Sequence, residues 1–221
     1  MANKAAYFDV DGTLVRGNIV HNYAFFARNP GSVGEALGRT AGLLASVPLL
    51  YLTDLVDRKA FNEVFYRNYK GLSRDRLRFL ADEHFEKIMK PNIFVEGLDL
   101  VRQCREAGCQ IVLVSGSLDF IIEPLANYLK VDEWITNRLE MIEGIATGRL
   151  QRPVMAGAVK SKWMREHAKR QDIDLDASFA YSDSFSDYPM LSVVGHPTVI
   201  NPDLQLKNTA RSLDWPVLQF D

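Results

Sequence analysis

The sequence predicts an α/β protein: a three-layer core in which helices cover both faces of a parallel sheet, with a helical insertion near its start. Three observations support this fold class. A short apolar strand comes first, in residues 5–10. A long stretch with helical spacing of apolar residues follows in 18–94, and from residue 95 strands and helices alternate. Such alternation is typical of parallel sheets, because a crossover helix connects each strand to the next.

Composition and charge narrow the functional classes. The chain of 221 residues is 47% hydrophobic and 24% charged, as in ordinary globular proteins, and its net charge is −2. It has no long basic run, so nothing indicates a nucleic-acid surface. Cys104 and Cys109 have neither metal-ligand nor disulfide-framework spacing, and we expect buried thiols. Because no cationic, apolar leader precedes the first strand, we expect a cytoplasmic location.

The first predicted strand ends in two carboxylates, Asp9 and Asp11, followed by a turn at Gly12 and Thr13. Side chains at positions i and i+2 of a strand share a face, so both acids would point to one side if the strand continues that far. If the chain bends at Val10, one of them offers its backbone carbonyl instead. Buried carboxylates need a positive partner, and magnesium prefers oxygen ligands. The alternative is an edge strand that ends in a solvated acidic turn.

The segment 18–94 is predicted to be helical. The runs 59–67 and 77–85 place apolar residues at helical spacing, and no strand-like alternation interrupts the segment. Residues 40–53 are uncharged and largely apolar, but they are too few to cross a bilayer as a helix and include Pro48. We expect a buried helix pair there. The alternative is a hairpin that faces a membrane or a lipid substrate.

The second half of the chain supplies the other layers of the predicted core. Its predicted elements are a helix at 97–107, a strand at 110–114, a helix at 119–129, a strand at 134–137, a hairpin at 138–150, a helix at 160–171 and strands at 179–182 and 198–200. Three of the predicted strands lead directly into Asp9, Ser115 and Asp183. Ligands of open parallel sheets bind beyond the carboxyl ends of the strands, so these three positions indicate a functional site.

Four motifs, in order along the chain, resemble the signatures of haloacid dehalogenase superfamily phosphatases, in the subgroup that includes phosphoserine phosphatase. They are DVDGTLV at 9–15, VSGS at 114–117, Lys160 within VKSKW at 159–163, and YSDSFSD at 181–187. The resemblance implies a Rossmann-like core formed by 1–17 and 95–221, with a helical cap formed by 18–94. It also implies a magnesium-dependent phosphomonoester hydrolase that acts through an aspartyl-phosphate on a small or lipid-linked organic phosphate.

The resemblance assigns roles to four acids. Asp9 would be the nucleophile, and Asp11 would protonate the leaving group and then deprotonate the attacking water. The magnesium ligands would be the Asp9 carboxylate, the Asp11 main-chain carbonyl and Asp183. Asp187 would hold the metal or its waters. Without the other motifs, Asp187 would be a simple helix N-cap.

The same resemblance assigns phosphate binding to the second and third motifs. The Ser115 side chain and the Gly116 amide would donate hydrogen bonds to phosphate oxygens, although these residues also suit a plain strand-to-helix turn. Lys160 would balance the charge of the nucleophile and of the transferring group. Its spacing to the fourth motif favours it over Lys162, the alternative being a solvated surface lysine. In the cap, Arg67 is a candidate partner of a substrate carboxylate or phosphate, or else a surface arginine.

Two departures from the family pattern concern the substrate. Residues 16–21 have no carboxylate where phosphoserine phosphatases have a glutamate that can pair with the substrate ammonium. The fourth motif has Ser182 and Ser184 where glycines are usual, and Ser186 where asparagine is usual. Both departures weaken the expectation of phosphoserine and leave histidinol phosphate and lipid phosphates as candidates. The sequence leaves the oligomeric state open.

Three other functions compete with phosphate ester hydrolysis. A dehalogenase of the same superfamily is disfavoured, because halide displacement needs neither Asp11 nor a metal. A phosphotransferase uses the same residues and stays open. The third alternative is a catalytically silent domain that binds a partner or a lipid, which the complete set of acids disfavours.

Overall fold

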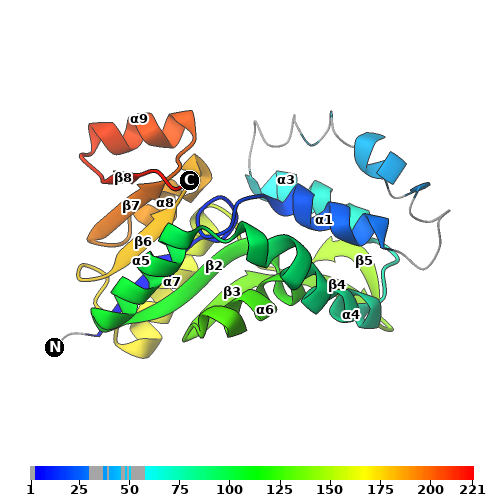
Figure 1. Cartoon of the computed structure of the whole chain (residues 1–221), viewed down its shortest axis with the longest axis horizontal. Coiled ribbons are helices and arrows are strands. Elements are labelled where there is room, and N and C mark those ends of the chain that lie inside the picture. Colours follow the sequence, from blue (N-terminus) through cyan, green and yellow to red (C-terminus); the bar gives the residue numbers. More distant parts are fainter. Residues whose placement is uncertain (1–2, 30–36, 39, 46–47, 49, 51–57) are drawn as a thin grey trace.

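The computed structural model describes residues 3–29, 37–38, 40–45, 48, 50 and 58–221. Their core is a six-stranded sheet with strand order β3-β2-β1-β6-β7-β8 (Figure 1). The strands are β1 (Lys4–Phe8), β2 (Cys109–Leu118), β3 (Glu133–Asn137), β6 (Phe179–Ser182), β7 (His196–Ile200) and β8 (Val217–Leu218). Every neighbouring pair is parallel, which confirms the predicted α/β fold class.

Helices pack against both faces of this sheet. The elements involved are α5 (Val95–Glu106) and α6 (Asp119–Leu129) in one hydrophobic core, and α7 (Ala158–Gln171), α8 (Tyr188–Leu191) and α9 (Leu204–Ser212) in the other. The two cores meet at β1, where Ala6 and Phe8 belong to the first and Ala5 and Tyr7 to the second. A strand buried on both faces is apolar without alternation, which explains the sequence of β1.

The described elements between β1 and α5 are helical. They are α1 (Ile19–Arg28), α3 (Arg58–Phe65), the 3₁₀ turn η1 (Tyr66–Tyr69), α4 (Arg74–His84), the π-helical turn η2 (Phe85–Met89) and the 3₁₀ turn η3 (Lys90–Asn92). Together with the hairpin of β4 (Leu139–Ile142) and β5 (Ile145–Leu150), helices α1, α3 and α4 lie at one end of the molecule, away from β7 and β8 (Figure 1). The division into a core and a cap stays a prediction.

The uncharged stretch 40–53 lies only partly within the described residues. Leu50 is buried and Leu43 packs against the larger hydrophobic core. The other described residues of the stretch are exposed, which differs from the expected buried helix pair; they are Thr40, Ala41, Gly42, Leu44, Ala45 and Pro48. Positions 46, 47, 49 and 51–53 lie outside the described residues. Of the helices that the structure describes, none is long and apolar enough to span a membrane.

The predicted hairpin joins the helical elements through its backbone. The Gly71 amide donates to the Ala146 carbonyl at 2.8 Å, and the Ala146 amide donates to the Leu72 carbonyl at 2.8 Å. A third bond, of 2.7 Å, runs from the Arg74 amide to the Gly144 carbonyl. The hairpin therefore extends the helical elements, although the chain reaches it only after β3.

The first strand is shorter than predicted. It ends at Phe8, because the Val10 carbonyl accepts hydrogen bonds from the amides of Thr13, Leu14 and Val15 and so turns the chain. Two cases were left open for Asp9 and Asp11. The structure shows the bend at Val10, and not a strand that continues through Asp11 with both acids on one face.

Candidate active site

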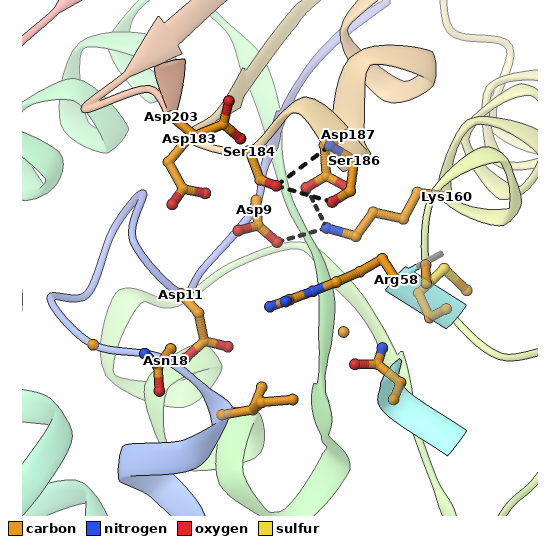
Figure 2. Close-up of a pocket in the computed structure, with 16 residues that line it drawn as sticks. Asp9, Asp11, Asn18, Arg58, Lys160, Asp183, Ser184, Ser186, Asp187 and Asp203 are labelled. Atoms are coloured by element: carbon orange, nitrogen blue, oxygen red, sulfur yellow. Dashed lines mark hydrogen bonds and ion pairs between the residues drawn. The ribbon is translucent and has the colours of Figure 1, made fainter. Parts of the chain in front are cut away.

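A cavity of about 250 Å³ lies just beyond the carboxyl ends of β1 and β6 (Figure 2). Its described lining consists of Asp9, Asp11, Gly17, Asn18, Ile19, Arg58, Asn62, Gly116, Met155, Ala156, Lys160, Asp183, Ser184, Ser186, Asp187 and Asp203. The predicted site residues among them are Asp9, Asp11, Gly116, Lys160, Asp183 and Asp187. Residues from widely separated parts of the chain thus meet at the edge of the sheet where the topology predicts a ligand site.

Lys160 lies at the centre of a buried ion-pair network (Figure 2). Its Nζ is 2.6 Å from Asp9 Oδ1 and 2.6 Å from Asp187 Oδ2. Burial alone would lower the pKa of Lys160, but the charges of Asp187 and Asp9 outweigh it and raise this pKa above its usual value. Lys160 is therefore a fixed cation. Lys162, by contrast, has a side chain that is 75% exposed and is absent from the described lining of the cavity.

Asp187 contacts this lysine. Its Oδ2 also accepts a hydrogen bond of 2.9 Å from the Ser182 hydroxyl, at the end of β6. The residue precedes α8, but its side chain makes no capping hydrogen bond, so the N-cap alternative does not describe it. Its contacts indicate that Asp187 orients the Lys160 ammonium.

Asp9 is buried and Asp183 is partly exposed, and both carboxylates line one cavity. Burial raises the pKa of Asp9 to about 7, although the neighbouring Lys160 lowers it. Burial and the charge of Asp9 raise the pKa of Asp183 to about 8. The ionised form of each carboxylate is disfavoured even with Lys160 nearby. A further positive charge in the cavity would favour the ionised forms.

The donor set around these two carboxylates fits magnesium. Within the described residues, no three or more His, Cys, Asp or Glu side chains are grouped so that they alone could hold a metal ion. Magnesium seldom uses such a cage, since it is usually bound by one or two carboxylates, with water and substrate phosphate completing the shell. Asp9 and Asp183 supply the carboxylates for a shell of that kind.

Gly12 makes room for the Asp183 carboxylate. Gly12 has a φ of +85°, in the left-handed region, and a Cβ atom built on it would overlap Asp183 Oδ2. Any residue with a Cβ atom at position 12 would displace the Asp183 carboxylate.

We expect Gly12→Ala to disable the site more than it destabilises the fold. The left-handed φ costs about 1 kcal/mol of unfolding free energy in an alanine variant, and the displaced Asp183 lowers kcat/KM about tenfold or more. The matched control is Gly108→Ala, because Gly108 has a φ of +80° and open space around its Cβ position. Steady-state kinetics and thermal unfolding of both variants check this. Equal losses of activity in the two variants would contradict it.

Asp11 is held by two donors. The Ser117 hydroxyl donates to Oδ2 at 2.6 Å, and Asn22 Nδ2 donates to Oδ1 at 3.1 Å. Burial raises the pKa of Asp11, while these hydrogen bonds act against the rise. A carboxyl group with a raised pKa and a fixed orientation suits proton transfer. Sequence reasoning assigned no role to either donor: Ser117 belongs to the second motif, but nothing in the sequence marks Asn22.

The second motif contributes Gly116 to the cavity but not Ser115. The Gly116 carbonyl accepts hydrogen bonds of 2.8 Å from the Tyr66 hydroxyl and 2.8 Å from Asn137 Nδ2, which fix its peptide group. Ser115 is fully buried, is absent from the described lining, and its hydroxyl accepts from the Ser117 amide at 3.0 Å. Strand β2 continues through Ser115 instead of ending before it, and a phosphate contact from its side chain stays a prediction.

Arg58 occupies the place that was predicted for Arg67. Arg67 lies in η1 with an exposed side chain and is absent from the described lining. Helix α3 ends at Phe65, and the tighter turn that follows places Arg67 away from the cavity. Arg58, at the start of α3, extends its guanidinium towards Asp9 and Asp11 (Figure 2) and packs over the Phe61 ring at 4.6 Å.

Comparison with known proteins places this site in a family. Residues 6–192 match the haloacid dehalogenase-like hydrolases. The chain belongs to this family. The protein named probable phosphatase Rv3661 of Mycobacterium tuberculosis is 30% identical over 225 residues, which cover 99% of this chain and 76% of that protein. Phosphoserine phosphatase SerB1 of the same organism is 31% identical over 218 residues, which cover 98% of this chain and 70% of its own.

A solved structure extends the likeness to three dimensions. It is a protein of unknown function from Bordetella pertussis Tohama I, with a TM-score of 0.83 and 25% sequence identity over 99% of both chains. The predicted family and its phosphoserine phosphatase-like relatives are thereby confirmed. So is the prediction that this haloacid dehalogenase-like hydrolase is an enzyme of the phosphatase type.

Proposed function

We propose that the chain is a magnesium-dependent phosphomonoester hydrolase that forms an aspartyl-phosphate on Asp9. The observation that carries the proposal is the buried ion pair of Lys160 with Asp9, in a cavity that also contains Asp11 and Asp183. Phosphoryl transfer requires an aligned nucleophile and neutralisation of the charge on the transferring group, and these residues can supply both.

In the first step, a carboxylate oxygen of Asp9 forms a bond to phosphorus while the bond from phosphorus to the leaving-group oxygen breaks. Lys160 holds Asp9 in place and offers its charge to the phosphoryl oxygens. The Gly116 amide donates a hydrogen bond to one of these oxygens. Asp11, whose pKa burial raises, gives its proton to the leaving alkoxide.

In the second step, Asp11 acts as a base. It takes a proton from water, the water oxygen bonds to phosphorus, and the bond between phosphorus and Asp9 breaks to release inorganic phosphate. The hydrogen bonds from Ser117 and Asn22 stabilise the ionised Asp11 that this step needs. Asp11 can serve as acid and then as base, because the first step leaves it ionised and the second step protonates it again.

A magnesium ion would be held by the Asp9 and Asp183 carboxylates and the Asp11 main-chain carbonyl. When bound, it would neutralise charge on the phosphoryl group and on the two acids. Their raised pKa values support this assignment, since a cation at that position favours the ionised forms. In this arrangement Asp187 positions Lys160 and does not coordinate the ion.

The substrate proposed is a small organic phosphate, bound between a core of residues 1–17 and 95–221 and a cap of residues 18–94. Relatives named as phosphoserine phosphatases support this class. The part of 16–21 that lines the cavity is Gly17, Asn18 and Ile19, which offers no carboxylate to a substrate ammonium, whereas Arg58 adds positive charge. A substrate with a second anionic group therefore suits the cavity better than phosphoserine does.

The test is hydrolysis of p-nitrophenyl phosphate with magnesium, with a chelator, and with magnesium restored. We expect activity only when magnesium is present. A panel of phosphoserine, histidinol phosphate, sugar phosphates and phosphatidylglycerophosphate then ranks the substrates by kcat/KM. Magnesium-independent turnover would contradict the metal assignment, phosphate transfer to added alcohols would favour a phosphotransferase, and no turnover of any ester would favour a silent binding domain.

A further inference from the structure

A second and larger cavity adjoins the catalytic one. Its volume is about 610 Å³, within the range of small-molecule sites, and its described walls come from the turn after β1, from α1 and from residues 88–92. Asp11 and Gly17 line both cavities. The two cavities are therefore adjacent, and Asp11, which is proposed to transfer protons, belongs to the wall of each.

Part of the second cavity is apolar. The apolar side chains that line it are those of Val15, Ala24, Phe25, Ile88 and Met89. Ile88 and Met89 belong to the π-helical turn η2, a rare geometry that often occurs at functional sites. Apolar walls gain free energy when an apolar ligand replaces the water against them, so this part of the cavity suits a hydrocarbon body.

The remaining wall carries positive charge. Arg16 and Arg28 line the cavity, and the only carboxylate in its described lining is Asp11, which already accepts hydrogen bonds from Asn22 and Ser117. The Arg16 guanidinium packs over the Phe94 ring at 5.2 Å. Within the described part of the chain, Arg28 has no ion-pair partner. Both arginines are exposed, so an anionic group on a ligand can pair with either of them.

The position of Asp11 connects this cavity to the chemistry. Asn22 lines the second cavity and donates to Asp11 Oδ1 at 3.1 Å. In the proposed reaction, Asp11 protonates the leaving-group oxygen, so the leaving group begins where the cavities meet. The catalytic cavity of about 250 Å³ must already hold the phosphoryl group, a metal ion and water. A longer leaving group has room in the second cavity.

We propose that the second cavity is the leaving-group subsite, and that the substrate is the phosphate ester of an alcohol with an apolar body and a terminal anionic group. This inference rests on the proposed phosphatase function. Phe25 and Ile88, which are partly exposed, contact the apolar body, and Arg28 pairs with the anionic end.

The first test compares phosphate esters of ethanol, hexanol and ω-hydroxyhexanoic acid in the presence of magnesium. We expect kcat/KM to rise on the order of 100-fold from the ethyl to the hexyl ester, because four more methylene groups leave water. The ester with the carboxylate should gain about a further fivefold by pairing with Arg28.

Two variants separate the apolar and the charged contributions. Ala24→Phe fills the cavity from α1, and we expect it to remove the advantage of both longer esters over the ethyl ester. Arg28→Gln should remove only the advantage of the carboxylate over the hexyl ester. The matched control is Arg102→Gln on α5, an arginine with a 64% exposed side chain that pairs with Asp99, which should leave all the ratios unchanged.

The outcomes distinguish this inference from the proposed function. Equal kcat/KM values for the three esters overturn the subsite and leave the phosphatase intact, whereas no turnover of any ester, p-nitrophenyl phosphate included, overturns both. Longer esters that stay favoured in Ala24→Phe place the leaving group elsewhere. If Ala24→Phe fails to fold, the Arg28→Gln ratio decides.

Discussion

Asp9→Asn is expected to lower kcat for p-nitrophenyl phosphate by about four orders of magnitude or more, because an amide cannot form the phosphoryl-enzyme bond. The variant should keep the fold, since asparagine has almost the same shape and removes a carboxylate that burial disfavours. Steady-state kinetics measure the loss, and circular dichroism with thermal unfolding confirms that the variant is folded.

The matched control is Asp99→Asn, an exposed acid on α5 that should leave kcat unchanged. Rapid acid quench with a ³²P-labelled ester provides an independent measurement. It should trap labelled protein from the wild type and none from Asp9→Asn. Substantial turnover by Asp9→Asn, or equal labelling of the two proteins, would show that the nucleophile is a different group.

Lys160→Gln is expected to lower kcat/KM on the order of 100-fold at neutral pH and to move the acid limb of the pH profile upwards. The sign follows from the network: Lys160 lowers the pKa of Asp9, so its removal raises that pKa above about 7. At neutral pH a smaller fraction of Asp9 is then ionised, and part of the activity should return as the pH increases.

The control for this prediction is Lys162→Gln, two residues along the same helix, which should change neither kcat/KM nor the pH profile. The change at Lys160 also breaks a buried ion pair, so thermal unfolding is measured alongside the kinetics. Asp187→Asn serves as a second variant, because it leaves Lys160 in place but weakens its orientation. A profile for Lys160→Gln that is lower at every pH but unshifted would contradict the electrostatic role.

Most of the fold follows from patterns that have a direct physical cause. The alternation of strands and helices after residue 95 predicted the parallel sheet, and helix 119–129 was predicted with the bounds it has as α6. Helix α9 and strand β8 were not predicted. Strand β8 has only two residues, both exposed, so no run of buried apolar residues marks it in the sequence.

The site was predictable where it depends on chemistry and less so where it depends on local geometry. Four acids, a lysine and a glycine meet in one cavity because adjacent strands end at the same edge of the sheet. Ser115 and Arg67 lie outside the described lining of the cavity, because the continuation of β2 and the 3₁₀ turn after α3 decide where those residues lie. Asn22 and Arg58 reach the site only through the folding of the helical segment, which no motif records.

The backbone bonds between the β4–β5 hairpin and the segment 71–74 have a consequence for how new specificity evolves in this protein. Two inserts that are far apart in the gene share hydrogen bonds, so they must diverge together: a length change in one leaves unpaired peptide groups in the other. When the substrate specificity changes during evolution, we therefore expect paired substitutions in the hairpin and in segment 71–74, while the strands of the six-stranded sheet stay unchanged.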